Sequence, residues 1–213
     1  MAKSVKATAP KFTREAPDVR RQALIDATLH CLARDGVEGA SVRRICEEAG
    51  VSAGLLRHYF GSKDNLIADT YRHVSRELLG PTEGFAEARE LAPHERLYRA
   101  IDVSMRPPIA ATDRLKVRLA FWHIAPSNPV VGRAHRRIRA DYLKAMTRLV
   151  EDAAAADGVT VEAGDLANGL SVMLDGFWIK MVLEPRRYSP EEMHRACRLM
   201  LEPHLPGYEG VGR

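Results

Sequence analysis

Apolar residues between positions 42 and 60 repeat with the period of an α-helix in two short segments. In the first segment they fall at i, i+3, i+4 and i+7 and so share one helical face: Val42, Ile45, Cys46 and Ala49. In the second, the apolar face consists of Leu56, Tyr59 and Phe60. Ser41 and Ser52 precede the segments as N-caps, and Gly50 can end the first helix in the left-handed conformation. The pattern predicts a helix-turn-helix.

The outward face of the second segment comprises residues 53, 54, 57 and 58. A short face that begins at a capped helix N-terminus can enter the major groove of DNA while backbone amides contact phosphate. Arg43 and Arg57 are candidates for base contacts, because a guanidinium fork matches two acceptors on guanine. The alternative is that both are solvated arginines on surface helices of an ordinary all-helical protein.

Helical patterns also fill the rest of the chain, and no extended β alternation interrupts them. Helices are predicted at about 18–35, 63–79, 93–106, 113–125, 128–156, 162–183 and 190–203. Gly80, Pro81 and Gly84 are expected to end the helix at 63–79. The prediction is an all-α protein with a flexible arm at 1–17, a DNA-binding domain at 18–80 that includes the linking helix, and a helical ligand-binding and dimerisation domain at 81–213.

Charge is unevenly distributed along the chain. Residues 1–63 contain 11 Lys and Arg against 7 Asp and Glu, whereas residues 64–213 contain 21 of each. The whole formal net charge of +4 therefore lies in the segment with the helix-turn-helix. A localised basic excess is the electrostatic signature of a nucleic-acid-binding domain.

Residues 20–66 resemble the DNA-binding domain of the TetR family of bacterial repressors. The resemblance rests on AGVS at 49–52, Gly54, HYF at 58–60 and SK at 62–63, with Leu24, Ala27, Thr28, Cys31 and Gly36 in the opening helix. It implies operator DNA as a partner and places His58 against phosphate. The candidate DNA-binding residues are Ser41, Arg43, Ser52, Ala53, Gly54, Arg57, His58, Tyr59 and Lys63. Ala53 and Arg57 depart from residues common in the family, so the operator sequence cannot be carried over.

The second half of the chain is similar to the choline-responsive, BetI-type repressors of that family. AFW at 120–122 and DGFW at 175–178, with their separation, carry this similarity. It implies a small-molecule effector, with a quaternary ammonium compound as one candidate. Homodimerisation through the helices at 162–183 and 190–203 is also expected, because apolar residues recur on both at helical spacing.

Aromatic residues near one acidic residue are the candidate effector-binding chemistry. The candidates are Phe121, Trp122, Tyr142, Asp175 and Trp178. Quaternary ammonium groups stack on aromatic faces and gain from a nearby carboxylate. The alternative is ordinary helix packing, with Asp175 paired to a backbone amide or an arginine.

Motifs of enzymes and metal sites were not found. The chain has no nucleophile elbow, no phosphate-binding glycine loop and no metal-like spacing of His, Cys or Asp, so neither a catalytic residue, a metal nor a cofactor is expected. The three cysteines lie on apolar helical faces and are expected in the core. No apolar run comes near the ~20 residues of a membrane span, and the N-terminus is not signal-like, so a cytoplasmic protein is expected.

Three functions compete on this sequence. A ligand-responsive DNA-binding transcriptional repressor is preferred, since its class uses both halves of the chain. The alternatives are a ligand-independent architectural DNA-binding protein and an enzyme with an accessory DNA-binding domain. Against the architectural protein, a neutral helical domain of about 130 residues is unnecessary for binding to the DNA backbone alone.

Overall fold

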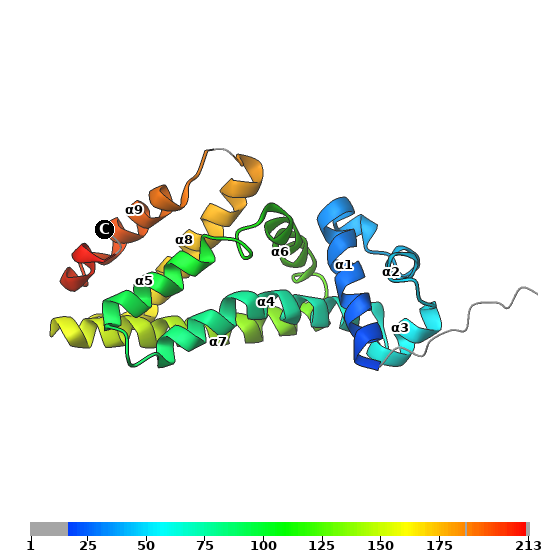
Figure 1. Ribbon diagram of the computed structural model, residues 1–213, viewed down its shortest axis with the longest axis horizontal. Helices are drawn as coiled ribbons and strands as arrows, with labels where there is room; N and C mark the ends of the chain where they lie inside the picture. Colours follow the sequence, from blue (N-terminus) through cyan, green and yellow to red (C-terminus); the bar gives the residue numbers. More distant parts are fainter. Residues whose placement is uncertain (1–16, 186, 212–213) are drawn as a thin grey trace, which may run out of the picture.

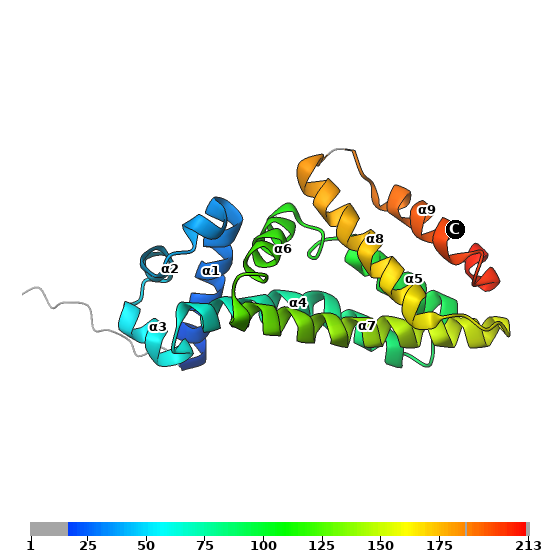
Figure 2. The ribbon, with the colours of Figure 1, turned by 180° about the vertical axis from the view of Figure 1, so that it is seen from behind.

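The computed structural model describes residues 17–185 and 187–211, and these residues form nine α-helices and one short 3₁₀-helix. The arm expected at 1–17 lies, apart from Pro17, outside the described residues. Figures 1 and 2 show the N-terminal helices gathered at one end, followed by α4 (Lys63–Glu87) and α7 (Pro129–Asp157), which are long and run side by side along the molecule. The prediction of an all-α fold is confirmed.

The helices at the first end begin and end where their side chains satisfy the backbone. α1 spans Pro17–Gly39, with a break at Gly36 (φ 66°, ψ −157°); α2 spans Val42–Ala49 and α3 spans Ala53–Phe60. The hydroxyl oxygens of Ser41 and Ser52 accept the backbone N–H groups of Arg44 and Leu55, both at 3.3 Å. The predicted caps, and the left-handed Gly50 (φ 64°), are confirmed.

α4 is longer than the sequence predicts. It spans Lys63–Glu87, so Gly80, Pro81 and Gly84 lie inside it instead of ending it. The reason is a continuous buried face on both sides of Pro81, formed by Leu78, Thr82 and Ala86 at i, i+4 and i+8. Burial of this face against the neighbouring helices outweighs the low helix propensity of glycine and proline.

The remaining helices follow the predicted order with small shifts at their ends. They are α5 (Pro93–Ser104), α6 (Thr112–Ile124), α7 (Pro129–Asp157), α8 (Ala163–Leu183), α9 (Pro190–Leu201) and the 3₁₀-helix η1 (Pro206–Gly210). The three cysteines are free and buried, as expected.

Two hydrophobic cores meet at α6. The first joins α1–α3 and the start of α4 to one face of α6 and the start of α7, through Phe121 and Val131 among others. The second joins the end of α4 to α5, α7, α8, α9 and η1, and it includes Leu115 of α6. Because α6 contributes to both cores, the two ends of the molecule are packed together through it.

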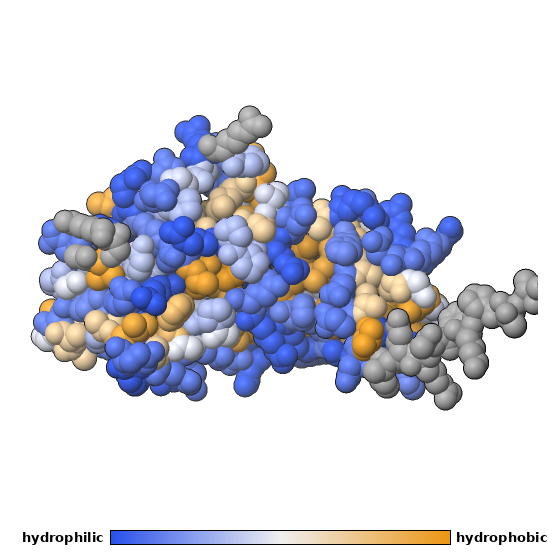
Figure 3. All heavy atoms as spheres, in the orientation of Figure 1, coloured by the Kyte–Doolittle hydropathy of each residue, from blue (hydrophilic) through white to orange (hydrophobic). Residues whose placement is uncertain are grey.

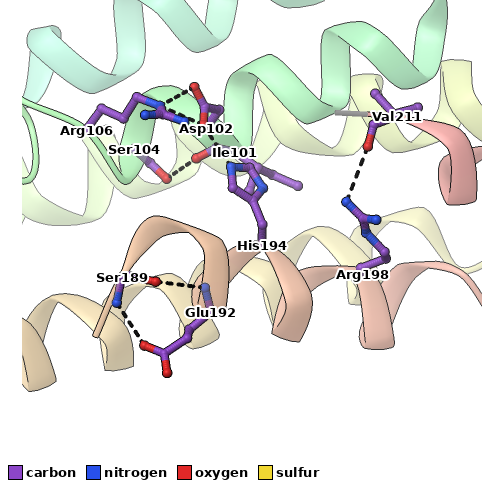
Figure 4. Close-up of polar contacts among 9 residues, drawn as sticks. All are labelled: Ile101, Asp102, Ser104, Arg106, Ser189, Glu192, His194, Arg198 and Val211. Carbon is purple, nitrogen blue, oxygen red and sulfur yellow. Dashed lines mark hydrogen bonds and ion pairs between the residues drawn. The ribbon is translucent and has the colours of Figure 1, made fainter. Parts of the chain in front are cut away.

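Polar contacts hold α9 against α5 (Figure 4). His194 Nε2 lies 2.8 Å from Asp102 Oδ1, and the same carboxylate accepts from Arg106 Nε at 2.7 Å. Ser189 and Glu192 form a capping box at the start of α9. The C-terminal helices are thus fixed by directed bonds as well as by apolar burial.

Apolar residues also remain on the surface of the last helices. Figure 3 shows one face of the molecule, on which hydrophilic residues predominate. Across the described residues α8 alone is long and apolar enough, by length and composition, to cross a membrane, which corrects the expectation that no apolar run comes near that length. Its large exposed apolar residues are Val172, Ile179 and Leu183, and Leu199 is exposed on α9.

Candidate DNA-binding face and effector cavity

The outward face of α3 is exposed as the sequence predicts. Ala53, Gly54, Arg57 and His58 are all exposed, while Leu56 and Phe60 on the opposite side are buried. The His58 ring meets the edge of half-buried Tyr59 at 5.3 Å between ring centroids. The buried side of α3 is therefore fixed in the first core, and its other side is free to contact a partner.

The other candidate DNA contacts surround this face. Arg43 of α2 is exposed and donates from Nε to Glu47 Oε1 at 2.8 Å. Lys63 is the first residue of α4, which Ser62 caps by accepting the N–H of Asn65 at 3.1 Å. Since a capping hydroxyl uses only its acceptor, Ser41 and Ser52 keep an O–H that can donate to a phosphate.

A partly open cavity of about 50 Å³ lies in the second half of the molecule, between four helices. Its lining comes from α4, α6, α7 and α8: Tyr71, Ser75, Leu78, Leu79, Arg118, Trp122, His135, Ile138, Arg139, Tyr142, Ser171, Leu174, Asp175 and Trp178. Trp122, His135, Arg139 and Asp175 also line a wider hollow of about 480 Å³. The cavity therefore has an outer side at this hollow and an inner side at Arg118, Tyr142 and Trp178.

The two tryptophans predicted from the sequence come together at this cavity. Their ring centroids are 6.5 Å apart, with 31° between the planes. Trp178 is buried and donates from Nε1 to the backbone oxygen of Ser104 at 2.9 Å. The Arg118 guanidinium lies over its ring, 4.3 Å from the centroid. One face of Trp178 is thus occupied by a cation from the protein.

Asp175 carries the negative charge of the cavity. Its Oδ2 lies 3.5 Å from Arg139 Nη1, and the same guanidinium donates to Ser171 Oγ at 2.9 Å and Asn168 Oδ1 at 3.0 Å. Burial raises the pKa of Asp175 to about 6, although Arg139 and Arg118 act in the opposite direction. Asp175 therefore has an arginine partner, as the alternative interpretation expected. The distance between the two charged groups is long, so the attraction offsets only part of the cost of burying the carboxylate.

Tyr142 and Phe121 differ in their relation to the cavity. Tyr142 lines it, and burial raises the pKa of its phenol, which keeps the hydroxyl protonated. Phe121, expected beside Trp122, instead packs in the first core against Tyr71, at 4.7 Å between centroids. Successive helical residues point about 100° apart, so Phe121 and Trp122 face different cores.

Several lining residues were not predicted from the sequence. Arg118 precedes Trp122 by four residues, a spacing that places both on one face of α6 and was the available signal. His135 and Arg139 of α7 also line the cavity. His135 Nδ1 lies 2.8 Å from the Tyr71 hydroxyl, and this bond joins α7 to α4 beside the first core.

Comparison with known proteins agrees with this geometry. Residues 24–70 match the N-terminal domain of bacterial regulatory proteins of the tetR family, and residues 93–206 match the C-terminal domain of BetI-type transcriptional repressors. Together with the exposed helix-turn-helix and the cavity, these matches define a ligand-responsive, DNA-binding transcriptional regulator and not an enzyme. The chain belongs to the TetR family, among the regulators with a BetI-type C-terminal domain.

Relatives and solved structures support the assignment over most of the chain. The HTH-type transcriptional regulator BetI of Paraburkholderia phytofirmans is 32% identical over 174 residues, covering 78% of this chain and 83% of its own. The crystal structure of a transcriptional regulator from Pseudomonas aeruginosa PAO1 aligns with a TM-score of 0.82 and 32% identity, covering 91% of this chain and 94% of its own.

A third structure, from Saccharomonospora viridis, was solved in complex with choline. It has a TM-score of 0.73 and 20% identity, and covers 87% of this chain and 96% of its own. At this identity the likeness is one of fold.

Proposed function

We propose that this protein is a repressor that leaves its operator when a small organic effector occupies the cavity. The observation that carries the proposal is the position of α4, which begins three residues after α3 ends and then forms a wall of the cavity. An effector that favours one arrangement of α4 therefore changes the position of α3. The boundary proposed at residue 80 falls inside α4, so this helix belongs to both domains.

The DNA-binding step uses α3 as the recognition helix. Arg57 reads a base edge, His58 and Lys63 contact phosphates, and the remaining candidates position the helix. A two-fold dimer presents two such helices to successive major grooves, roughly 34–36 Å apart. The protein acts in the cytoplasm, where operator DNA is accessible.

The dimer interface lies on α8 and α9. Val172, Ile179, Leu183 and Leu199 are large apolar residues left exposed on these two helices, and a partner copy would cover them. Val172→Asp combined with Leu199→Asp should give a monomer by light scattering at micromolar concentration. Val19→Asp, a matched change at an exposed valine of α1, should leave the dimer intact.

The effector is a small organic molecule with a quaternary ammonium group. Trp122 lies at the outer side of the cavity with Asp175, and an aromatic face beside a carboxylate suits such a cation. The choline found in the Saccharomonospora viridis structure supports this class of effector.

The test begins with an operator selected from random duplex DNA by the purified protein. Choline and betaine aldehyde are then titrated into the protein–operator complex, and a fall in affinity of about five- to 150-fold is expected. Trp178→Ala should bind the operator but fail to release it, while Phe177→Ala, which does not line the cavity, should respond normally. If Trp178→Ala responds as the unaltered protein does, the effector binds elsewhere.

A further inference from the structure

Arg118 is a buried charge that the proposed function leaves without a role. Its side chain is 5% exposed, and its Nε and Nη2 are buried without a hydrogen-bond partner among the described residues. The ring of Trp178 covers one side of the guanidinium. Burial lowers the pKa of Arg118, yet a guanidinium remains charged in proteins. A buried charge with two unpartnered N–H-bearing nitrogens is costly, so its retention in a cavity points to a ligand.

The carboxylates that act electrostatically on Arg118 are Asp175 and Glu77, and each is paired with another arginine. Asp175 lies 3.5 Å from Arg139, and Glu77 lies 2.9 Å from Arg114. In the described part of the chain, Arg118 itself forms no ion pair within 4.0 Å. With Asp175 ionised, Arg118 and Arg139 still leave the lining with one excess positive charge. The inner side of the cavity is therefore suited to an anion.

The donor geometry indicates which anion. A guanidinium presents its N–H groups as a planar fork that matches the two oxygens of a carboxylate. The Tyr142 hydroxyl is a second donor, buried and without a partner among the described residues. The cavity of about 50 Å³ suits the small, planar carboxylate, and the wider hollow beyond Trp122 holds the rest of a ligand.

We infer that the effector carries a carboxylate, which Arg118 and Tyr142 bind at the inner side of the cavity, while the cationic end lies toward Trp122 and Asp175. The effector is then a zwitterion. This inference rests on the proposed function for its biological meaning, but binding to the free protein tests it separately.

Four small compounds separate the contributions of the two ends. Choline and glycine betaine share a trimethylammonium group, and choline has a hydroxymethyl group where glycine betaine has a carboxylate. 3,3-Dimethylbutan-1-ol and 3,3-dimethylbutanoate are their respective analogues, with a neutral carbon in place of the charged nitrogen. Calorimetry with the full chain should show each carboxylate binding about ten- to hundredfold more tightly than its alcohol. Choline binding as tightly as glycine betaine, or the absence of binding by both carboxylates, overturns the inference.

Variants assign the preference to Arg118. Arg118→Met should abolish the preference for carboxylates, and Arg118→Lys, which keeps the charge without the fork, should retain part of it. Lys116→Met removes a positive charge from the exposed face of the same helix and should change nothing. A preference that survives in folded Arg118→Met contradicts the assignment. If the carboxylates bind but do not release operator DNA, this inference holds and the proposed function fails.

Discussion

The DNA-binding end and the effector end of the molecule place their chemistry in opposite ways. The outward residues of the first lie on one helix of eight residues and are exposed. The polar groups of the second come from four helices, between Tyr71 and Trp178, and surround a partly open cavity. Local sequence is therefore enough to determine the exposed face of α3, whereas the site between helices depends on which helices pack together.

Substitution of Phe121 is expected to have the largest effect on stability, because this residue joins the two ends of the molecule. It lies on α6 of the effector end but packs at 0% exposure in the core of the DNA-binding end. Phe121→Ala should therefore lower the free energy of unfolding by about 3–5 kcal/mol and speed amide hydrogen exchange in α1. Urea denaturation measures the first effect and mass spectrometry the second.

Phe177→Ala is the matched control for this prediction. Phe177 is only partly buried and belongs to the second core, so its loss should be smaller and should leave exchange in α1 unchanged. Equal exchange in α1 for both variants would mean that the two ends are not joined through α6.

Arg57 tests whether the exposed face reads bases. Arg57→Ala should weaken specific binding by about 1–3 kcal/mol at one base position, because a bidentate contact is lost. Lys63→Ala should weaken binding to all sequences alike and reduce the salt dependence. Fluorescence anisotropy with operator and random duplexes measures both; equal losses on the two duplexes for Arg57→Ala exclude a base-reading role.

The sequence predicted the DNA-binding end well because its signals are local. Ser41, Ser52 and Gly50 act within one helical turn of their own positions, and the structure places all three as predicted. The predicted end of α4 was wrong. Gly80 and Pro81 have low helix propensity, but the helix continues through them because its next residues are buried against segments distant in the sequence.

The effector end was only partly predictable for the same reason. Periodicity could show that Trp122 and Trp178 lie on helices, but it could not show that Phe121 faces the other core. Nor could it distinguish a solvated arginine from one buried in a cavity, as Arg118 is, since that depends on what packs over it. The spacing between Arg118 and Trp122 places both on one face of α6, but it does not show that this face lines a cavity.

Asp175 gives the buried site a pH dependence that the exposed face lacks. Its pKa is raised to about 6, so lowering the pH from 8 to 5 protonates it and removes the charge that attracts a cation. Affinity for choline should fall about tenfold over this range, as the ionised fraction does. His135, whose pKa is lowered by burial and by Arg139, lies on the same side of the cavity and is the competing titratable group.

Two variants separate these groups by calorimetry at a series of pH values. Asp175→Asn should bind choline weakly and with little pH dependence, whereas His135→Gln should keep the dependence of the unaltered protein. A fall in affinity that persists in Asp175→Asn and disappears in His135→Gln would assign the titration to the imidazole instead.

Substitution of Gly54 is expected to have the smallest effect on stability, and it tests directly whether the exposed start of α3 contacts DNA. It is the second residue of α3, and a Cβ at this position would meet only Ser52 Oγ, at 3.7 Å, which is an ordinary contact. Nothing within the described fold therefore requires glycine, and Gly54→Ala should raise the free energy of unfolding by about 0.5–1 kcal/mol. If the start of α3 lies against a phosphate, the same methyl group should weaken operator binding.

Gly164→Ala is the matched control, since Gly164 is the second residue of α8, also follows an alanine and has open space around it. It should stabilise the protein similarly and leave operator affinity unchanged; an unchanged affinity in Gly54→Ala as well would move the DNA contact away from the N-terminus of α3.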